Sequence, residues 1–395
     1  MSTIKKAGIV TLVDYSNYGN RLQNYALVCV LREMGIESRS GLFVVSREDM
    51  LRQSMYTDSK LIIFIKKIIP WKLYIKYAKY NQQKEDDTRD ELLKKRIKKF
   101  KKFTNNYTEE FSTLYARDAA ELKELLNDSE YQYWITGSDQ VWNPTFSGDD
   151  YFFLTFTDYR KRYSYAASIG VSEIPFQQKD RYAARIRDMK YLSVREEGAA
   201  KLVKDLTGKE ADVSVDPTLL LEVEEWKSLE KMPDISLPSE YICAYFLGEI
   251  PNSIKQFSQE KELPIIFLND KKYSDLYVLD PAEFIYVLEH SRYIFTDSFH
   301  AVVFSIIFEK NFYVFQRKQK DIEGMFERIH SITKRFSLEN RIMNREVLHA
   351  IPDIQKQQWE VIRTKLSQER LECRNKLRRA LFEEDFFQGN STGEL

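Results

Sequence analysis

Residues 293–304 read Tyr-Ile-Phe-Thr-Asp-Ser-Phe-His-Ala-Val-Val-Phe. The run Tyr293–Thr296 has no alternation of apolar and polar residues, which is typical of a strand buried on both faces of a parallel sheet. A helix is predicted to begin at Phe299. Ser298 stands at the N-cap position, where its hydroxyl is expected to accept a hydrogen bond from an early helix N–H. A buried strand that passes directly into a helix is the basic unit of an α/β fold.

The same alternation extends to both sides of this segment, from about residue 241 to residue 315. The predicted strands are Tyr241–Leu247, Pro264–Leu268, Tyr293–Thr296 and Phe312–Phe315. The predicted helices between them are Asn252–Glu262, Ala282–His290 and Phe299–Glu309. Continuous apolar strands that alternate with helices predict one parallel sheet in this half of the chain.

An earlier series has the same character. It opens with an apolar run, Ala7–Val13, followed by a polar turn over residues 14–20 and a helical pattern, Arg21–Met34, that ends at Gly35. Further strands are predicted at Tyr133–Thr136, Tyr163–Ala167, Tyr191–Val194 and Ala211–Val215. The Pro-containing stretch Lys231–Ser239 is interpreted as a linker between the two series.

We therefore predict an α/β protein with two doubly wound, Rossmann-like domains facing across a cleft. The expected domains are residues 1–230 and 239–350, with a closing helix and tail over residues 351–395. Two domains also suit the 395-residue length, because single cores stop growing at roughly 250–300 residues. In such sheets ligands bind at the carboxyl ends of the strands.

A basic helical insertion is predicted within the first domain, over residues about 50–127. Residues 60–102 hold 15 Lys and Arg against 5 Asp and Glu, interleaved with Trp71, Tyr74, Tyr77 and Tyr80. One interpretation is a helix that lies on an anionic membrane surface, which combines cationic and aromatic faces in this way. The other is a solvated helical face that packs its aromatic residues on the first domain.

Composition narrows the class of protein. The chain has 60 Lys and Arg against 60 Asp and Glu, and this balance argues against nucleic-acid binding. Its three cysteines, Cys29, Cys243 and Cys373, have neither paired nor metal-like spacing, so we expect a reducing compartment and no structural metal. No signal peptide and no spanning apolar run is apparent, which predicts a soluble, cytoplasmic protein.

Two segments place polar side chains where strands are expected to end. His300 lies in the first turn of a helix that follows a strand, and such a helix N-terminus favours a bound anion; the alternative is a histidine that merely packs. Residues 137–143, Gly-Ser-Asp-Gln-Val-Trp-Asn, form a loop rich in donors and acceptors. Its alternative is an Asx-type turn with a packing tryptophan, Trp142.

Two further segments are weaker signals. Arg195 follows the predicted strand Tyr191–Val194 and is suited to bind phosphate or carboxylate with two parallel hydrogen bonds. Its alternative is a surface arginine paired with a neighbour such as Glu196. The opening turn, residues 17–24, offers amide and guanidinium donors beside a helix N-terminus. The glycine-rich dinucleotide fingerprint is absent there, which disfavours a nicotinamide or flavin enzyme.

Six stretches, in this order, are similar to motifs of the polysaccharide pyruvyl transferase family: residues 17–27, 137–143, 165–170, 193–196, 215–220 and 296–300. The resemblance runs from residue 8 to about residue 340 and leaves out only the insertion and the tail. It implies a fold similar to the two-domain B-type glycosyltransferases, with the acceptor on the first domain and the donor on the second.

The resemblance also implies a chemistry. The donor is phosphoenolpyruvate, and the acceptor is a sugar with two nearby hydroxyls in a cell-surface polysaccharide or its precursor, free or as a lipid-linked oligosaccharide. The products are a pyruvate ketal and phosphate, without cofactor or metal. Arg195 resembles the arginine that holds the donor, and His300 resembles the catalytic histidine. The expected substrate-binding residues are Asn17, Gly19, Asn20, Arg21, Gln23, Gly137, Ser138, Asp139, Gln140, Ser298 and Phe299.

Two residues depart from the family pattern. Some branches read Thr-Asp-Arg-Leu-His-Gly at the last motif, where this chain has Ser298 in place of the arginine and Ala301 in place of the glycine. Two other functions fit the same fold. One is a nucleotide-sugar glycosyltransferase, and the other is a non-catalytic member of a polysaccharide-assembly complex. Each of these functions is compatible with a protein that works in the cytoplasm at the inner face of the membrane.

Overall fold

The computed structural model describes residues 4–42, 44–47, 51, 64, 66–145, 150–317, 323–343 and 352–383. Two parallel five-stranded sheets dominate it, one in each half of the chain, and confirm the predicted α/β fold. In the described residues no helix combines the length and the apolar character needed to cross a bilayer.

The first sheet has the strand order β4-β2-β1-β6-β7 and is parallel throughout. Its strands are β1 (Lys5–Val10), β2 (Ile36–Ser40), β4 (Glu109–Glu110), β6 (Tyr133–Thr136) and β7 (Arg162–Ser164). Gly8 lies beneath the indole of Trp134, where a Cβ would come within 2.1 Å of the ring. Glycine at this position therefore lets the largest side chain of β6 lie flat on the sheet.

Several elements flank this sheet. The two-stranded sheets pair β3 (Val44–Ser46) with β5 (Leu114–Ala116) and β8 (Ser193–Val194) with β9 (Asp212–Val213). The helices are α1 (Tyr18–Glu33), α6 (Ala119–Leu125), α7 (Lys179–Arg187) and α8 (Glu197–Thr207), whereas the next helix, α9 (Val223–Leu229), lies in the other half of the molecule. The predicted linker follows α9 and precedes the second sheet without forming a helix or strand.

The second sheet has the order β11-β10-β12-β13-β14 and is also parallel. Its strands are β10 (Ile242–Tyr245), β11 (Ile265–Leu268), β12 (Tyr293–Thr296), β13 (Asn311–Phe315) and β14 (Ile342–Met343). Its helices are α10 (Ser253–Lys261), α11 (Ser274–Tyr277), α12 (Pro281–Glu289), α13 (Phe299–Ile307) and α14 (Glu323–Arg335). Every strand of the predicted second series is present within two residues of its expected ends.

The predicted insertion is only partly helical. It contains the helices α4 (Trp71–Thr88), α5 (Glu91–Tyr107) and α6, but the same region also supplies the strands β4 and β5. β4 pairs with β2, with Arg39 opposite Glu109, and so extends the first sheet. The predicted helical insertion is therefore present, but its strands were not predicted, because β4 has two residues and depends on a partner some 70 residues away, which leaves no periodicity to detect.

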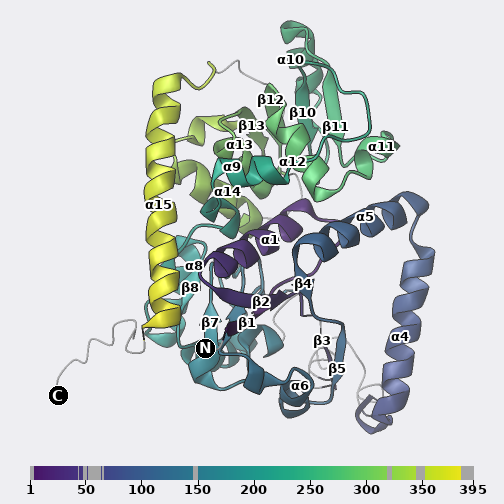
Figure 1. The fold of residues 1–395 in the computed structure, drawn as a ribbon, viewed down its shortest axis with the longest axis vertical. Coiled ribbons are helices and arrows are strands. Elements are labelled where there is room, and N and C mark those ends of the chain that lie inside the picture. The colour runs from purple at the N-terminus through teal and green to yellow at the C-terminus, as the bar shows by residue number, and fades with distance from the viewer. Residues whose placement is uncertain are drawn as a thin grey trace, which may run out of the picture.

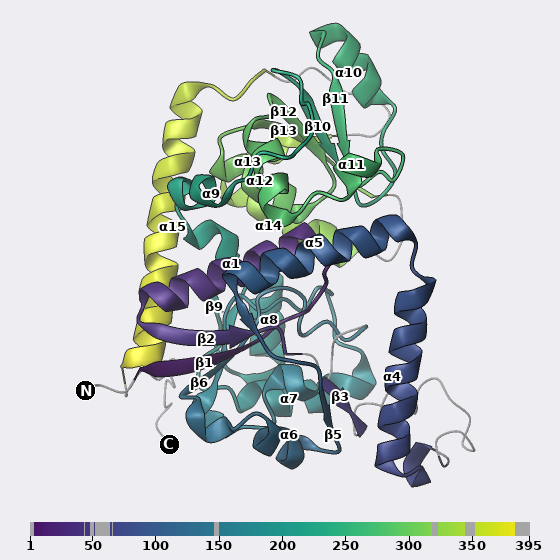
Figure 2. The ribbon, with the colours of Figure 1, turned by 45° about the vertical axis from the view of Figure 1, so that its right-hand side comes forward.

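Helices α1 and α5 lie between the two sheets (Figure 2). Tyr18 of α1 stacks on Phe284 of α12, with ring centroids 4.1 Å apart, and its hydroxyl donates to the carbonyl of Leu279 at 2.9 Å. One apolar cluster runs through α1, α12 and α13. The two halves therefore share a core along α1.

The predicted closing helix is α15 (Lys356–Phe382), which runs alongside both sheets (Figure 1). Trp359 and Leu377 on it are buried at opposite ends of its length. Arg370, 5% exposed, donates from Nε to the carbonyl of Leu219 at 2.9 Å and from Nη2 to the carbonyl of Leu221 at 2.8 Å. A buried arginine therefore anchors the middle of α15 to the first half. The predicted tail beyond residue 383 lies outside the described residues.

Candidate functional site

Side chains from both halves meet where strands of the two sheets end. His300 begins α13 just after β12, and its Nε2 lies 3.6 Å from Oδ2 of Asp216 in the first half. Arg195 follows β8, and Asp139 follows β6. The carboxyl ends of parallel strands carry the binding sites of such sheets. We define these residues with Arg328 of α14 as the inter-sheet cluster.

Asp216 is the best-connected member of the inter-sheet cluster. Its Oδ1 accepts from the N–H and the hydroxyl of Thr218, at 3.0 and 2.7 Å. Its Oδ2 accepts from Nη1 of Arg195 at 2.7 Å and from the hydroxyl of Ser138 at 3.3 Å. Burial alone would raise the pKa of this carboxyl, but the positive charges of His300 and Arg195 and the N–H of Thr218 hold it far below its usual range. Asp216 is thus a fixed negative charge beside His300.

His300 is held tightly against the opening turn of the chain. The residue is 8% exposed, and its ring contacts the edge of Phe299 at 5.1 Å between centroids. A Cβ on Gly19 would come within 2.0 Å of Nδ1 of His300, so this position has room for no side chain. The polar turn predicted over residues 14–20 is wrong at its end, because Gly19 lies in the first turn of α1, where its missing side chain permits close approach of the helix to the imidazole.

Two arginines flank the ring of Phe299. The guanidinium of Arg195 lies 4.9 Å from the ring centroid and that of Arg328 lies 5.7 Å from it. Nε of Arg195 also pairs with Oε1 of Glu196 at 3.1 Å. Burial would lower the pKa of Arg195, but Glu196 and Asp216 raise it above its ordinary value and keep the side chain charged. Arg195 is 5% exposed, so the surface location in the alternative interpretation is wrong, whereas the expected pairing with Glu196 is present.

Arg328 approaches the cluster from α14. Its Nη1 lies 3.9 Å from Oδ1 of Asp139, whose Oδ2 accepts from the amide of Asn20 at 3.1 Å. Burial and the repulsion of Arg195 lower the pKa of Arg328 to about 10. Burial would raise the pKa of Asp139, but Arg195 and Arg328 lower it. The cluster therefore contains two closely spaced buried cations, each with at least one carboxylate.

Three nitrogen atoms of the inter-sheet cluster are left without a hydrogen-bond partner among the described residues. They are Nη2 of Arg195, Nε of Arg328 and Nε2 of His300, and all three are buried. A buried polar group without a partner is costly, so such atoms call for an explanation. Guanidinium groups beside a helix N-terminus are suited to bind an anion with phosphate or carboxylate oxygens.

The structure places the predicted residues of the opening turn mostly in internal contacts. Asn17 caps α1 by accepting from the N–H of Asn20. Arg21 pairs with Glu110 at 2.6 Å, and the amide of Gln23 donates to the hydroxyl of Thr11 at 3.1 Å. Of the predicted residues in this segment, Gly19 and Asn20 reach the inter-sheet cluster, whereas the side chains of Asn17 and Arg21 and the amide nitrogen of Gln23 bond within the first half.

In the second predicted loop, residues 137–143, some side chains contact the inter-sheet cluster and others bond within the loop. Ser138 and Asp139 contact the cluster, as described. Gly137 has a φ of +108°, and a Cβ there would meet the carbonyl of Tyr165 at 2.3 Å. Oε1 of Gln140 accepts from the amide of Asn143 at 2.7 Å, and Asn143 in turn accepts from the N–H of Thr145. The Asx-type turn with its buried tryptophan is therefore present in the same loop that supplies Asp139.

The predicted cap of α13 is wrong in one respect. Ser298 occupies the N-cap position, but its side chain makes no capping hydrogen bond. Its own N–H donates to the hydroxyl of Thr296 at 3.0 Å, and that hydroxyl donates to the carbonyl of Tyr245 at 2.6 Å. Thr296 therefore fixes this turn, because its hydroxyl bridges β10 and the backbone of Ser298.

Sequence reasoning missed Arg328, Asp216 and the pair of Asp297 with Arg317. Asp297 accepts from the N–H groups of Leu247 and Gly248 at 2.8 and 2.9 Å, and Arg317 lies 3.1 Å from it. A signal for Arg328 was present in the sequence. It stands between Phe326 and Ile329 and four residues before Ile332, all of which are buried, so its charge falls on the apolar face of its helix.

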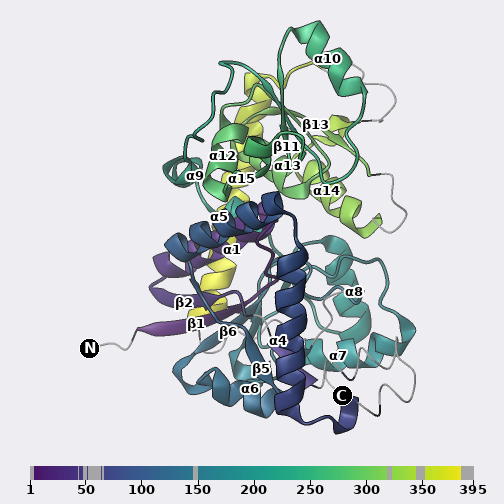
Figure 3. The same cartoon turned by 90° about the vertical axis from the view of Figure 1, so that its right-hand side faces the viewer.

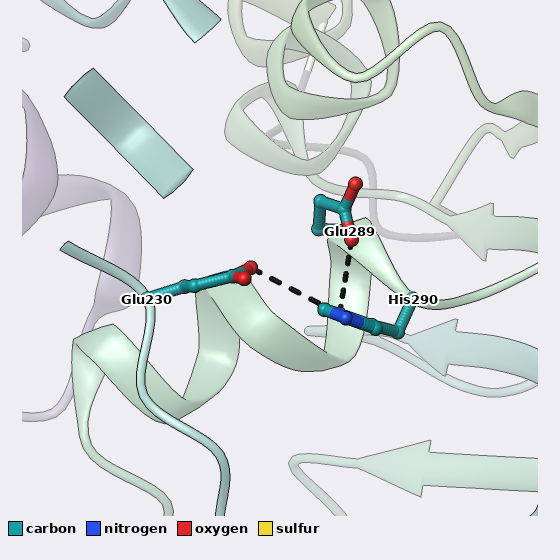
Figure 4. A group of neighbouring side chains, drawn as sticks. All are labelled: Glu230, Glu289 and His290. Atoms are coloured by element: carbon teal, nitrogen blue, oxygen red, sulfur yellow. Dashed lines mark ion pairs between the residues drawn. The ribbon is translucent and has the colours of Figure 1, made fainter. Parts of the chain in front are cut away.

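A second group of titratable residues lies away from this cluster (Figure 4). Nδ1 of His290 is 3.0 Å from Glu289 and 3.9 Å from Glu230. The same Nδ1 lies 3.1 Å from the carbonyl of Tyr286, and Lys227 pairs with Glu289 at 3.2 Å. Ion pairs between α9 and the end of α12 account for this group, and the nearby lysine opposes binding of a cation.

Comparison with solved structures finds chains of low identity. The UDP-GlcNAc 2-epimerase from Methanocaldococcus jannaschii is 10% identical with a TM-score of 0.48, over 83% of this chain and 92% of that chain. A UDP-GlcNAc 2-epimerase from Neisseria meningitidis is 12% identical with a TM-score of 0.43, over 96% and 94%. A glycosyltransferase from Rickettsia africae is 10% identical with a TM-score of 0.42, over 96% and 99%.

Comparison with protein sequences gives a different result. No curated protein matches the chain. The family model described as polysaccharide pyruvyl transferase matches residues 17–319. This span includes Gly19, Asp139, Arg195, Asp216 and His300, and it ends before Arg328. It covers well over half of the sequence and agrees with the six motifs, so the chain belongs to the polysaccharide pyruvyl transferase family.

Proposed function

We propose that this protein transfers the enolpyruvyl group of phosphoenolpyruvate to two hydroxyls of a sugar, forming a pyruvate ketal and phosphate. The observation that carries the proposal is the pair of buried guanidinium nitrogens without a hydrogen-bond partner, Nη2 of Arg195 and Nε of Arg328, close to His300. Phosphoenolpyruvate has two anionic groups, a phosphate and a carboxylate. Two guanidiniums at the start of α13 match that pair of charges.

The reaction requires proton transfer to carbon. His300 protonates the methylene carbon of phosphoenolpyruvate, and positive charge develops at the central carbon as a sugar hydroxyl adds to it. The C–O bond to phosphate then breaks, and the second hydroxyl adds to close the ketal ring. Of the two hydroxyl protons released, one replaces the proton given to the methyl group and the other leaves with phosphate. Histidine is suited to this exchange near neutral pH.

The remaining residues of the inter-sheet cluster position these groups. Asp216, at 3.6 Å from Nε2 of His300, stabilises the protonated imidazole. Arg195 and Arg328, both buried, stabilise the departing phosphate as fixed cations. Ser138 and Thr218 hold Asp216 in place through their hydroxyls. We further propose that the acceptor belongs to a cell-surface glycan assembled at the inner face of the membrane, either free or linked to lipid.

Calorimetric titration with phosphoenolpyruvate tests the donor. The wild-type protein is expected to bind it at one site, and Arg328→Ala is expected to weaken binding at least about tenfold, because a charge-assisted hydrogen bond is lost. Lys334→Ala, an exposed lysine on the same helix, is the matched control and keeps wild-type affinity. Titration with a nucleotide sugar addresses the glycosyltransferase alternative. Tight binding of the nucleotide sugar with none of phosphoenolpyruvate would overturn the proposal.

Turnover tests the role of His300. In an assay of phosphate release with a panel of free and lipid-linked sugars, His300→Asn is expected to lose at least ~100-fold in rate, the scale of a general acid. His290→Asn removes an exposed histidine at the end of α12 and is expected to retain full activity. Equal rates for the two variants would remove His300 from the mechanism.

A further inference from the structure

The helix α4 presents one face that nothing in the described part of the chain covers. No residue of α4 is buried. Its largest apolar side chains on this face are Leu73, Tyr77 and Tyr80, which are 53%, 59% and 65% exposed. Figures 1 and 3 show α4 standing along the outside of the first half. We call the residues Lys72, Leu73, Lys76, Tyr77 and Tyr80 the outer face of α4.

Helical geometry places these residues together. Leu73, Tyr77 and Tyr80 follow the i, i+4, i+7 spacing of one stripe, and Lys72 and Lys76 lie beside it. Residues 66–80 contain five lysines and no acidic residue. Acidic residues appear only at the far end of the helix, over residues 85–87. The outer face therefore combines apolar and aromatic groups with an uninterrupted positive charge.

The opposite side of α4 is attached to the protein. The rings of Trp71 and Tyr74 stack with centroids 5.3 Å apart, and both residues are partly buried. Nζ of Lys79 lies 5.1 Å from the ring centroid of Tyr115. Ala78 lines a pocket of about 630 Å³ between α4, α5 and the first sheet. The aromatic residues of α4 thus divide into an inner pair, which stacks and is partly buried, and an outer pair, which is exposed.

We propose that the outer face of α4 docks the protein on an anionic lipid bilayer. Exposed aromatic and aliphatic side chains enter the boundary between headgroups and acyl chains, and lysines on the same face pair with anionic headgroups. A charged polar partner would leave Leu73 and Tyr80 in water, and an apolar protein surface would leave the lysines without partners. The bilayer surface satisfies both sets of groups. This docking does not depend on the reaction that the protein catalyses.

Sedimentation with vesicles tests the proposal. The full-length protein is expected to bind vesicles of phosphatidylcholine mixed with phosphatidylglycerol, and to be released as salt is raised, because screening weakens the attraction of lysines for headgroups. Pure phosphatidylcholine vesicles are expected to retain much less protein. Failure to bind the anionic vesicles at low salt, or binding that is equal on both vesicles and independent of salt, would overturn the proposal.

Variants separate this face from the rest of the surface. The double change Lys72→Glu with Lys76→Glu, and the triple change of Leu73, Tyr77 and Tyr80 to Ser, are each expected to reduce partitioning at least about tenfold. The matched controls lie on α15: Lys365→Glu for charge, and Val361→Ser with Leu371→Ser for exposed apolar groups. Controls that lose as much binding as the α4 variants would overturn the proposal. The proposal would also be wrong if the triple variant still binds vesicles but loses self-association, measured by analytical ultracentrifugation, because the face would then serve contacts between copies of the chain.

Discussion

The two helices α4 and α5 are neighbours in the chain and both contain several lysines, yet the protein uses them in opposite ways. Both carry many lysines and a stripe of apolar residues at helical spacing. α5 buries Arg96, Phe100, Phe103 and Thr104, whereas α4 buries no residue. The difference shows that periodicity tells which residues share a face, but only tertiary contacts tell whether that face has a partner.

Arg96 explains why α5 is fixed. Its Nε and Nη2 donate to the carbonyl of Ser16 at 3.0 and 2.6 Å, and its Nη1 donates to the carbonyl of Tyr277 and to Oδ1 of Asn269, both at 3.0 Å. The guanidinium also lies 4.6 Å from the ring centroid of Tyr18. One side chain of the insertion therefore holds the loop before α1 in the first half, and the loop after β11 and the end of α11 in the second half.

Removing Arg96 is expected to give the largest effect. Arg96→Ala should lower the free energy of unfolding by about 3–5 kcal/mol, because several buried hydrogen bonds to a charged donor are lost and their acceptors are left unpaired. Lys95→Ala, one residue earlier on the exposed side of α5, should change it by less than about 0.5 kcal/mol. Denaturant titration measures both. Equal effects would mean that α5 contributes through its helix alone.

A conservative change in the core of α5 should have an intermediate effect. Phe100 is fully buried, and its ring lies 4.9 Å from that of Tyr18. Phe100→Leu should cost about 1–2 kcal/mol, because the ring contact is lost and a small cavity remains. Tyr80→Leu on the outer face of α4 should cost less than about 0.5 kcal/mol. A comparable loss from Tyr80→Leu would break the contrast between the two helices.

The ion pair between Lys99 of α5 and Glu283 should make a smaller contribution to stability, which is lost at acidic pH. Glu283 accepts from Nζ of Lys99 at 3.0 Å, from the N–H of Asp280 at 2.8 Å and from Nζ of Lys231 at 2.9 Å. Burial would raise the pKa of Glu283, but these partners lower it. A depressed pKa in the folded state stabilises the protein above the unfolded pKa of ~4.3, and this stability is lost as pH falls through the folded value.

The matched variants check that sign. Glu283→Gln should be less stable than wild type at neutral pH, and the difference should shrink as pH falls below about 5. Glu85→Gln on α4 removes an exposed carboxylate paired with Arg89 at 3.3 Å, and exposed pairs of this kind contribute little. Thermal melts across pH measure both. A constant difference for Glu283→Gln down to low pH would mean that the carboxylate does not titrate with folding.

Sequence patterns predicted the strands that bracket the site. β6 and β12 have the expected bounds, Tyr133–Thr136 and Tyr293–Thr296, because both are unbroken apolar runs between turn residues. β4 was not predicted, since two residues carry no periodic signal and their place in the sheet depends on β2. The basic segment was predicted as one helical unit, and its division into an attached and an exposed helix depends on contacts made by Arg96 with both halves.

For the site, too, the sequence indicated residues that follow strands but not the contacts between distant segments. His300 and Arg195 were identified because each follows a strand, and Gly19 because it belongs to the first of the six motifs. Arg328 reaches the inter-sheet cluster from a helix that no motif marks, and only its place on an apolar face indicated burial. Asp216 belonged to a recognised motif, but its contacts with His300, Arg195 and Ser138 come from three different parts of the chain.

The smallest effect on stability is expected from the outer face of α4. The triple change of Leu73, Tyr77 and Tyr80 to Ser should alter the free energy of unfolding by no more than about 0.5 kcal/mol per site, because all three side chains are already more than half exposed. Serine has a lower helix propensity than leucine, so a slight loss is expected to come from the helix itself. Denaturant titration of the triple variant beside wild type measures it. A loss of several kcal/mol would show that the outer face is packed in solution. If that loss depends on protein concentration, the face packs on a second copy of the chain; if it does not, the face packs on another segment of the same chain. A small loss together with lost vesicle binding would separate the two helices by function, α5 joining the halves and α4 serving the surface on which the protein works.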